Sequence, residues 1–226
     1  MHPFHDALVS FAERRDITMS KMKLESMVLG PIQTNCYLVL NRESGELLIV
    51  DPADDAMRIR ERIAAMGGRP AAILLTHGHF DHIGAAEELK AYYNAPIYAM
   101  AEEKEILENT QNNLSGLYGR GYTVCADCFL KDGEVLQLAG FEIHVLHTPG
   151  HTVGGACYYF PEAKVVFSGD TLFHGSVGRT DFPTGSMGML HESLHKKLFE
   201  LPDDTAVYPG HDASTDIAYE KRYNPY

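Results

Sequence analysis

Hydrophobic and polar residues alternate along this chain in two patterns. Short apolar runs bounded by Gly, Pro, Asn or Asp predict buried β-strands, because they are too short for a helix and end at turn residues. The predicted strands cover residues 23–29, 36–40, 47–50, 72–76, 96–99, 134–138, 141–146, 156–160, 164–168 and 205–208. Apolar residues three or four positions apart predict amphipathic helices at 53–66, 83–93, 102–112 and 189–198.

The strands fall into two groups with helices between them. This order predicts an α/β (α+β) fold in which two mixed β-sheets pack face to face and helices cover the outside. With 226 residues, the chain is long enough to bury a substantial core. We expect one domain from residue 22 to 226, preceded by an N-terminal extension of residues 1–21. That extension lacks the continuous apolar segment of a secretory signal, and the sequence assigns no function to it.

The segment 113–130, rich in Gly, Tyr and Asn, is the least regular part of the predicted fold. Two interpretations stay open: this loop covers a substrate, or it is a surface excursion. The same segment contains Cys125 and Cys128, the one C-x-x-C pair of the sequence. A single pair cannot complete a four-ligand zinc site, so we expect packed or solvent-near thiols rather than a functional site.

The acidic composition argues against several classes of function. The formal net charge is −12 and the sequence pI is about 5.4. Phosphate-backbone binding needs clustered Lys and Arg, whereas the longest basic runs here have two residues, so no nucleic-acid partner is expected. No run approaches the ~20 apolar residues that cross a bilayer. We therefore expect no membrane role and, since four cysteines fit a reducing compartment, a cytoplasmic protein.

The chemistry of the chain is most visible after the apolar run 71–75. Three histidines and one aspartate, His77, His79, Asp81 and His82, occupy six consecutive positions there. Imidazole and carboxylate are ligand types that suit zinc, iron and manganese. His77 and His79, two apart in extended chain, project from one face, and Asp81 and His82 fall at the start of the next helix. The motif predicts a metal site, with a second ion beside the first.

Three further candidates complete such a site. His151, Asp170 and His211 each follow an apolar, strand-like run and each lies in a Gly-containing turn. Strand ends are where α/β folds place functional side chains, because rigid elements hold the loops there. A polar turn with histidines by chance would not explain these three partners.

The order H-x-H-x-D-H, then His, Asp and His, resembles the metallo-β-lactamase fold superfamily of metallohydrolases from about Met22 onward. This resemblance implies a four-layer αβ/βα sandwich with two divalent metal ions, zinc first and iron or manganese as alternatives. It implies that His77, His79 and His151 bind one metal, that Asp81, His82 and His211 bind the second, and that Asp170 bridges them. Asp81 and Asp170 are then catalytic, and a metal-bridging hydroxide is the nucleophile.

The segments 169–182 and 29–39 look like the glyoxalase II (hydroxyacylglutathione hydrolase) branch, together with the persulfide dioxygenases. This similarity implies that Arg179 holds a glutathione carboxylate, although a local pair with Asp181 is an equal alternative. His174 is expected at the mouth of the site. Fifteen residues follow His211, so the chain corresponds to a short form without the helical C-terminal domain of glyoxalase II. The cluster at 221–223 is then the candidate to replace its contacts.

Three functions remain. The first is a dinuclear hydrolase of a small-molecule thioester or ester. The second is a mononuclear iron persulfide dioxygenase that fills the site of His77, His151 and Asp170. The third is a metal-binding protein without turnover. The natural substrate and the metal stay open, as does the choice between monomer and homodimer.

Overall fold

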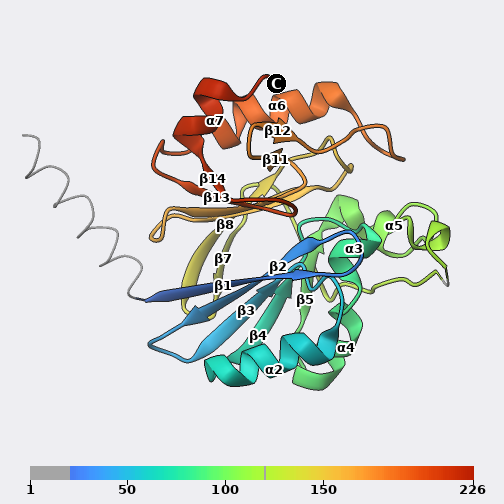
Figure 1. Cartoon of the computed structure of the whole chain (residues 1–226), viewed down its shortest axis with the longest axis vertical. Helices are drawn as coiled ribbons and strands as arrows, with labels where there is room; N and C mark the ends of the chain where they lie inside the picture. The colour runs from blue at the N-terminus through green and yellow to red at the C-terminus, as the bar shows by residue number, and fades with distance from the viewer. Residues whose placement is uncertain (1–20, 120) are drawn as a thin grey trace, which may run out of the picture.

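A computed structural model of the chain describes residues 21–119 and 121–226. Two six-stranded sheets pack face to face, with helices on both outer faces (Figure 1). The first sheet has the order β1-β2-β3-β4-β5-β6; its first three strands are antiparallel neighbours and its last four run parallel. Its strands are β1 (Met22–Leu29), β2 (Thr34–Asn41), β3 (Glu46–Val50), β4 (Arg69–Leu74), β5 (Ile97–Met100) and β6 (Cys128–Leu130).

The second sheet has the order β14-β13-β10-β9-β8-β7, in which only β10 and β13 are parallel neighbours. Its strands are β7 (Val135–Leu138), β8 (Phe141–His147), β9 (Ala156–Phe160), β10 (Val165–Gly169), β13 (Ala206–Pro209) and β14 (Thr215–Asp216). A small hairpin, β11 (Leu172–Phe173) and β12 (Ser176–Val177), follows β10. Both sheets are therefore mixed, as the sequence predicts.

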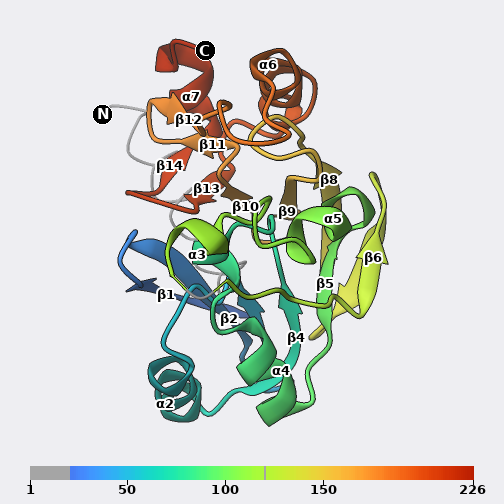
Figure 2. The same cartoon turned by 90° about the vertical axis from the view of Figure 1, so that its right-hand side faces the viewer.

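The helices lie in two outer layers, seen from the side in Figure 2. One layer, with α2 and α4, covers the first sheet, and the other, with α6 and α7, covers the second. The α-helices are α2 (Ala56–Met66), α3 (Phe80–Ile83), α4 (Ala86–Tyr93), α5 (Lys104–Leu107), α6 (Met187–Lys196) and α7 (Ile217–Tyr223). Short 3-10 turns are η1 (Ala101–Glu103), η2 (Ser115–Leu117) and η3 (Leu198–Glu200).

Three apolar clusters hold the layers together, and β2 shows how. Tyr37 and Val39 point into the cluster between the sheets, where the Tyr37 ring meets Phe167 of β10. The alternate residues Leu38 and Leu40 point the other way, into the cluster beneath α2 and α4. Because successive side chains of a strand face opposite sides, a strand covered on both faces is apolar throughout. The clusters confirm the predicted four-layer αβ/βα sandwich.

Several predicted boundaries differ from the structure for local reasons. The helix predicted from residue 53 begins at Ala56, because the Asp55 side chain accepts a hydrogen bond from the backbone N–H of Arg58 and caps it. The helix predicted at 83–93 begins later, as α4 at Ala86, and the short helix α3 precedes it up to Ile83. The helix predicted at 102–112 shrinks to η1 and α5, and the strand predicted to 76 ends at Leu74.

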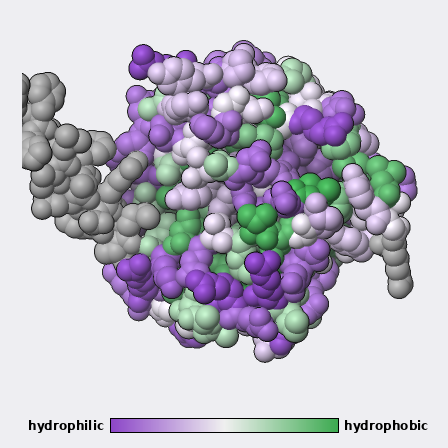
Figure 3. All heavy atoms as spheres, viewed as in Figure 1, coloured by the Kyte–Doolittle hydropathy of each residue, from purple (hydrophilic) through white to green (hydrophobic). Residues whose placement is uncertain are grey.

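The surface seen in Figure 3 is mainly hydrophilic, with hydrophobic residues gathered in small patches. Among the described residues, no helix combines the length and apolar character that a membrane span requires. The predicted N-terminal extension, apart from Lys21, lies outside the described residues.

Candidate metal centre

The fold brings all seven predicted ligand residues together between the two sheets. His77 and His79 follow β4, whereas Asp81 and His82 belong to α3, as the sequence predicts for the start of a helix. From the second sheet, His151 follows β8, Asp170 follows β10 and His211 follows β13. Their nitrogen and oxygen atoms form three overlapping groups, each within 4.8 Å, that could hold a metal ion.

The first group consists of His77, His79 and His151. The Nδ1 atom of His79 lies 2.9 Å from Nε2 of His151. The ring centroid of His77 lies 4.8 Å from those of both His79 and His151, and all three side chains are buried. Three imidazoles from two strand ends therefore converge on one point.

Asp170 connects this group to Asp81, His82 and His211. Its Oδ2 atom lies 3.5 Å from Nε2 of both His151 and His211, and its Oδ1 atom lies 3.4 Å from Nε2 of His82. Asp81 Oδ2 lies 3.3 Å from His211 Nε2 and 3.6 Å from His82 Nε2. The Asp170 carboxylate thus faces His151 of the first group as well as His82 and His211.

Several buried side-chain atoms of the centre lack a hydrogen-bond partner among the described residues. Buried atoms without a hydrogen-bond partner include His77 Nε2, His79 Nε2, His82 Nε2 and Asp170 Oδ1. Buried polar atoms are almost always paired, because an unpaired one costs about 1–3 kcal/mol. Four such atoms aimed at one region fit a divalent cation, whose ligands these atoms would be.

Burial keeps two of the histidines neutral. Burial and the neighbouring His82 hold the pKa of His77 well below its usual range. Burial and the neighbouring His151 lower the pKa of His79 to about 3. A neutral imidazole carries a free lone pair at pH 7, which is the state that a metal requires.

The carboxylates raise the pKa of two other histidines of the centre, His82 and His211. Burial opposes protonation of His82, but Asp81 and Asp170 outweigh it and hold its pKa well above its usual range. Burial likewise opposes protonation of His211, but hydrogen bonds to the same carboxylates raise its pKa to about 9. Burial alone would raise the pKa of Asp81, yet the histidines lower it to about 2. The cluster therefore attracts positive charge, which a bound cation would supply in place of protons.

Asp51 orients part of the centre from beneath and was not predicted as a site residue. Its Oδ2 atom accepts a hydrogen bond from Nδ1 of His82 at 2.9 Å, which leaves Nε2 of His82 free for a metal. It also accepts hydrogen bonds from the Thr76 backbone N–H and hydroxyl, at 2.7 and 2.6 Å. Asp51 directly follows β3, so its place at a strand end was the available signal.

Glu103, fully buried, fixes the loops that carry the first group. Its Oε1 atom accepts a hydrogen bond from the Gly78 N–H at 2.8 Å, and its Oε2 atom accepts one from the Thr152 hydroxyl at 3.0 Å. Gly78 lies between His77 and His79, and Thr152 follows His151. Burial raises the pKa of Glu103, and hydrogen bonds from Gly78, Thr152 and the Gly154 backbone offset part of this rise. The net pKa is about 7. No sequence pattern marks Glu103.

Close backbone approach explains two glycines beside Asp170. Gly169 has φ +49°, and a Cβ there would lie 2.4 Å from the Thr76 hydroxyl oxygen. A Cβ on Gly210 would lie 2.2 Å from Asp170 Oδ1 and 2.6 Å from His82 Cε1. Any side chain at residue 210 would therefore enter the centre.

Arg179 contributes its backbone to the centre and its side chain to the surface. Its carbonyl oxygen accepts a hydrogen bond from His151 Nδ1 at 2.7 Å, which leaves Nε2 of His151 facing Asp170. Its guanidinium pairs with both oxygens of Asp181 at 2.7 Å and lies 4.0 Å from the Phe182 ring centroid. Of the two interpretations for Arg179, the structure contains the local pair.

The remaining substrate candidates lie further out. His174 is exposed, with its ring 4.7 Å from that of Tyr219 in α7. Lys221 pairs with Asp203 at 2.7 Å, and Arg222 lies over the Tyr223 ring. Their roles in substrate binding stay predictions.

The profile of the Metallo-beta-lactamase superfamily matches residues 29–211, which include the whole centre. The chain belongs to this superfamily. A curated relative, the hydroxyacylglutathione hydrolase GloC of Haemophilus influenzae, is 38% identical over 211 residues, which cover 91% of this chain and 98% of GloC. The superfamily, with this relative, makes the chain a metallo-hydrolase family member, and the His/Asp cluster implies divalent metals.

Two solved structures extend the comparison. The BLEG-1 B3 metallo-beta-lactamase is 40% identical with a TM-score of 0.85, and the match covers 90% of this chain and 98% of that one. The structure of TTHA1623 in a di-iron-bound form is 37% identical with a TM-score of 0.79, over 89% of this chain and 98% of that one. Each match covers nearly the full length of the solved chain, so these relatives share the described fold.

Proposed function

We propose that the chain is a dinuclear metal-dependent hydrolase of thioesters or esters. The observation that carries the proposal is the position of Asp170, with Oδ2 facing His151 and His211 and Oδ1 facing His82. One carboxylate between two histidine groups is the arrangement of a bridging ligand. In this assignment His77, His79 and His151 hold one cation, and Asp81, His82 and His211 hold the other.

When bound, such cations lower the pKa of a coordinated water to near neutrality and polarise the substrate carbonyl. The chain's own groups hold the arrangement in place. Asp51 and the Arg179 carbonyl fix the rings of His82 and His151 through their Nδ1 atoms. The Thr34 hydroxyl donates to Asp81 Oδ2 at 2.8 Å and restrains that carboxylate.

Hydrolysis adds one water across the acyl bond. The water oxygen joins the carbonyl carbon to give a carboxylic acid, the bond to sulfur or oxygen breaks, and the leaving group takes a proton as a thiol or alcohol. Asp81 and Asp170 stay ionised throughout, because the neighbouring histidines hold both pKa values below the usual range despite burial. Their part is to hold charge and orientation rather than to exchange protons.

The relatives support this choice without fixing the substrate. GloC bears the name of a thioester hydrolase, and TTHA1623 was solved with two irons. BLEG-1 bears the name of a β-lactamase, so a β-lactam is the comparison substrate. Since the Arg179 guanidinium is paired with Asp181, a glutathione carboxylate would have to compete for it. We therefore propose thioesters and esters as the class and zinc as the first metal to test.

The experiment combines metal analysis with a substrate panel. Protein purified without added metal is analysed for zinc, iron and manganese, then assayed with S-lactoylglutathione, a short acyl thioester, an aryl ester and a β-lactam. Two metals per chain with thioester or ester turnover that chelation abolishes is the expected result. One iron per chain with oxygen consumption on a persulfide would instead establish the dioxygenase, and bound metal without any turnover would establish the non-catalytic alternative.

A further inference from the structure

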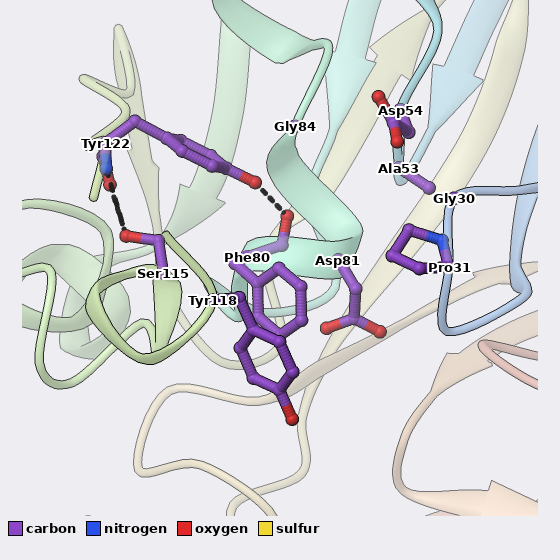
Figure 4. A pocket seen from close by; sticks show the side chains of 10 residues that line it. All are labelled: Gly30, Pro31, Ala53, Asp54, Phe80, Asp81, Gly84, Ser115, Tyr118 and Tyr122. Atoms are coloured by element: carbon purple, nitrogen blue, oxygen red, sulfur yellow. Dashed lines mark hydrogen bonds between the residues drawn. The ribbon is translucent and has the colours of Figure 1, made fainter. Parts of the chain in front are cut away.

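A pocket of about 240 Å³ opens beside Asp81. Figure 4 shows the Phe80 and Tyr118 rings next to the Asp81 carboxylate, with Pro31 and Asp54 on the other side of the pocket. Asp81 is thus shared between the pocket and the candidate metal centre. A group that fills the pocket therefore lies next to a candidate metal ligand.

The aromatic wall of the pocket is held in shape. The rings of Phe80 and Tyr118 stack at 4.4 Å with an interplanar angle of 22°. The Tyr122 hydroxyl donates to the Phe80 carbonyl at 2.6 Å, and the Phe80 N–H donates to the Asn113 carbonyl at 2.8 Å. The Ser115 hydroxyl also bonds to the Tyr122 backbone. The loop predicted to cover a substrate is therefore tied to α3, and its Tyr118 ring stays 63% exposed for contact.

The charge of the pocket is one-sided. Of the ten described residues that line it, Asp54 and Asp81 carry carboxylates, and none is Lys, Arg or His. The cations of the proposed centre would neutralise Asp81, whereas Asp54 is exposed and, among the described residues, its side chain accepts a hydrogen bond from the neighbouring Asp55 N–H at 2.7 Å. Asp54 therefore places a second carboxylate at the pocket wall, apart from the candidate metal ligands.

We propose that this pocket receives the acyl group of the substrate and selects compact, flat or apolar acyl groups without negative charge. The proposal rests on the proposed hydrolase function. Pockets for drug-sized ligands measure roughly 300–1,000 Å³, so about 240 Å³ suits the smaller part of a thioester rather than a peptide-like thiol. A flat acyl group stacks on the Tyr118 ring, while an acyl group ending in a carboxylate meets the Asp54 carboxylate, with no basic side chain among the described lining residues.

The test uses acetyl, benzoyl and succinyl thioesters of one small thiol, so that the leaving group is constant. We expect kcat/KM for benzoyl to exceed that for succinyl by about tenfold or more, the size of one uncompensated charge contact near a protein surface. Asp54→Asn removes the charge at constant shape, so it should bring kcat/KM for succinyl several-fold closer to kcat/KM for benzoyl. Tyr118→Ala should lower kcat/KM for benzoyl about tenfold with a smaller change for acetyl, because it removes the stacking wall.

Asp55→Asn is the matched control. It makes the same charge change one residue away, where the side chain caps α2 instead of lining the pocket, and Asn caps as well as Asp. Its ratio of kcat/KM for benzoyl to kcat/KM for succinyl should stay within about twofold of the ratio in the unaltered protein. If thioesters are hydrolysed but Asp54→Asn leaves the ratio unchanged, the pocket proposal is overturned while the hydrolase stands. If no thioester or ester is hydrolysed at all, it is the proposed function that fails.

Discussion

Glu103 offers the sharpest test of how the centre is built, because it is buried, contacts no candidate ligand directly and has an exposed neighbour of the same type. Its carboxylate accepts hydrogen bonds from Gly78 and Thr152, and one from the Gly154 backbone. We predict that Glu103→Gln weakens both the fold and the metal site. The amide keeps one oxygen as an acceptor, but its NH₂ group replaces the other acceptor and leaves a backbone N–H without a partner.

The magnitude follows from those contacts. Hydrogen bonds to a charged group contribute about 1.5–3 kcal/mol each, and a buried donor left unpaired costs about 1–3 kcal/mol. Because Glu103→Gln loses one such contact and weakens the others, we expect the free energy of unfolding to fall by about 2–4 kcal/mol. That is a large fraction of the roughly 5–15 kcal/mol stability of a typical protein. Glu103→Ala removes every acceptor and should cost more, so the Gln variant is the informative one.

The assay measures urea unfolding of chelator-treated protein at pH 8, above the raised pKa of about 7 of Glu103, together with zinc affinity by chelator competition. Outer contacts of a metal site typically contribute 10–100-fold to affinity, and a loss in that range is expected here. Glu102→Gln is the control, since Glu102 is exposed and its change should stay within about 0.5 kcal/mol. Equal stability and zinc affinity of Glu103→Gln and Glu102→Gln would refute the reasoning.

Three further predictions concern the centre itself. Asp170→Asn should lower metal content below two per chain and abolish turnover, because it removes the shared negative charge; a variant that keeps both metals and its full rate would disprove the bridging assignment. In chelated protein, the raised pKa of His211 contributes stability that is complete below pH 6.5 and lost as pH rises through about 9, so the melting temperature should fall across that range and fall less in His211→Gln. Gly210→Ala should reduce metal affinity, since its Cβ would lie 2.2 Å from Asp170 Oδ1, whereas Gly188→Ala in α6, with open space around it, should be tolerated or slightly stabilising.

The sequence was most informative where a local pattern and a strand end coincide. Each ligand-bearing turn follows an apolar run, and such runs predict buried strands without knowledge of their neighbours. The structure confirms this for β10, whose pairing with β13 shifts between Phe167 and Gly169 just before Asp170. A shift of this kind re-aims the chain at a strand end. Gly169 is visible in the sequence, but its pairing with β13, where the register shifts, is not.

Other elements were missed because their signals are short or hidden. β6 has three residues, Cys128–Leu130, which are too few to show a strand pattern in the sequence. It is recognised as a strand because it pairs with β5. In α7, the buried position Glu220 carries a carboxylate that accepts hydrogen bonds from the Gly175 N–H, Thr215 and Asn224. A charged residue on the inner face interrupts the apolar spacing by which helices are predicted.

Two kinds of residue surround the centre. Asp51 and Glu103 are buried carboxylates that hold ligand-bearing segments, so changes there alter metal affinity and lower the rate on every substrate together. Asp54 and Tyr118 line an open pocket and do not position a candidate metal ligand. Changes there should therefore alter the ratio of kcat/KM between substrates while the metal content stays constant. A variant of Asp54 or Tyr118 that lost metal, or a variant of Glu103 that changed only the acyl preference, would show that metal binding and substrate choice share one set of contacts.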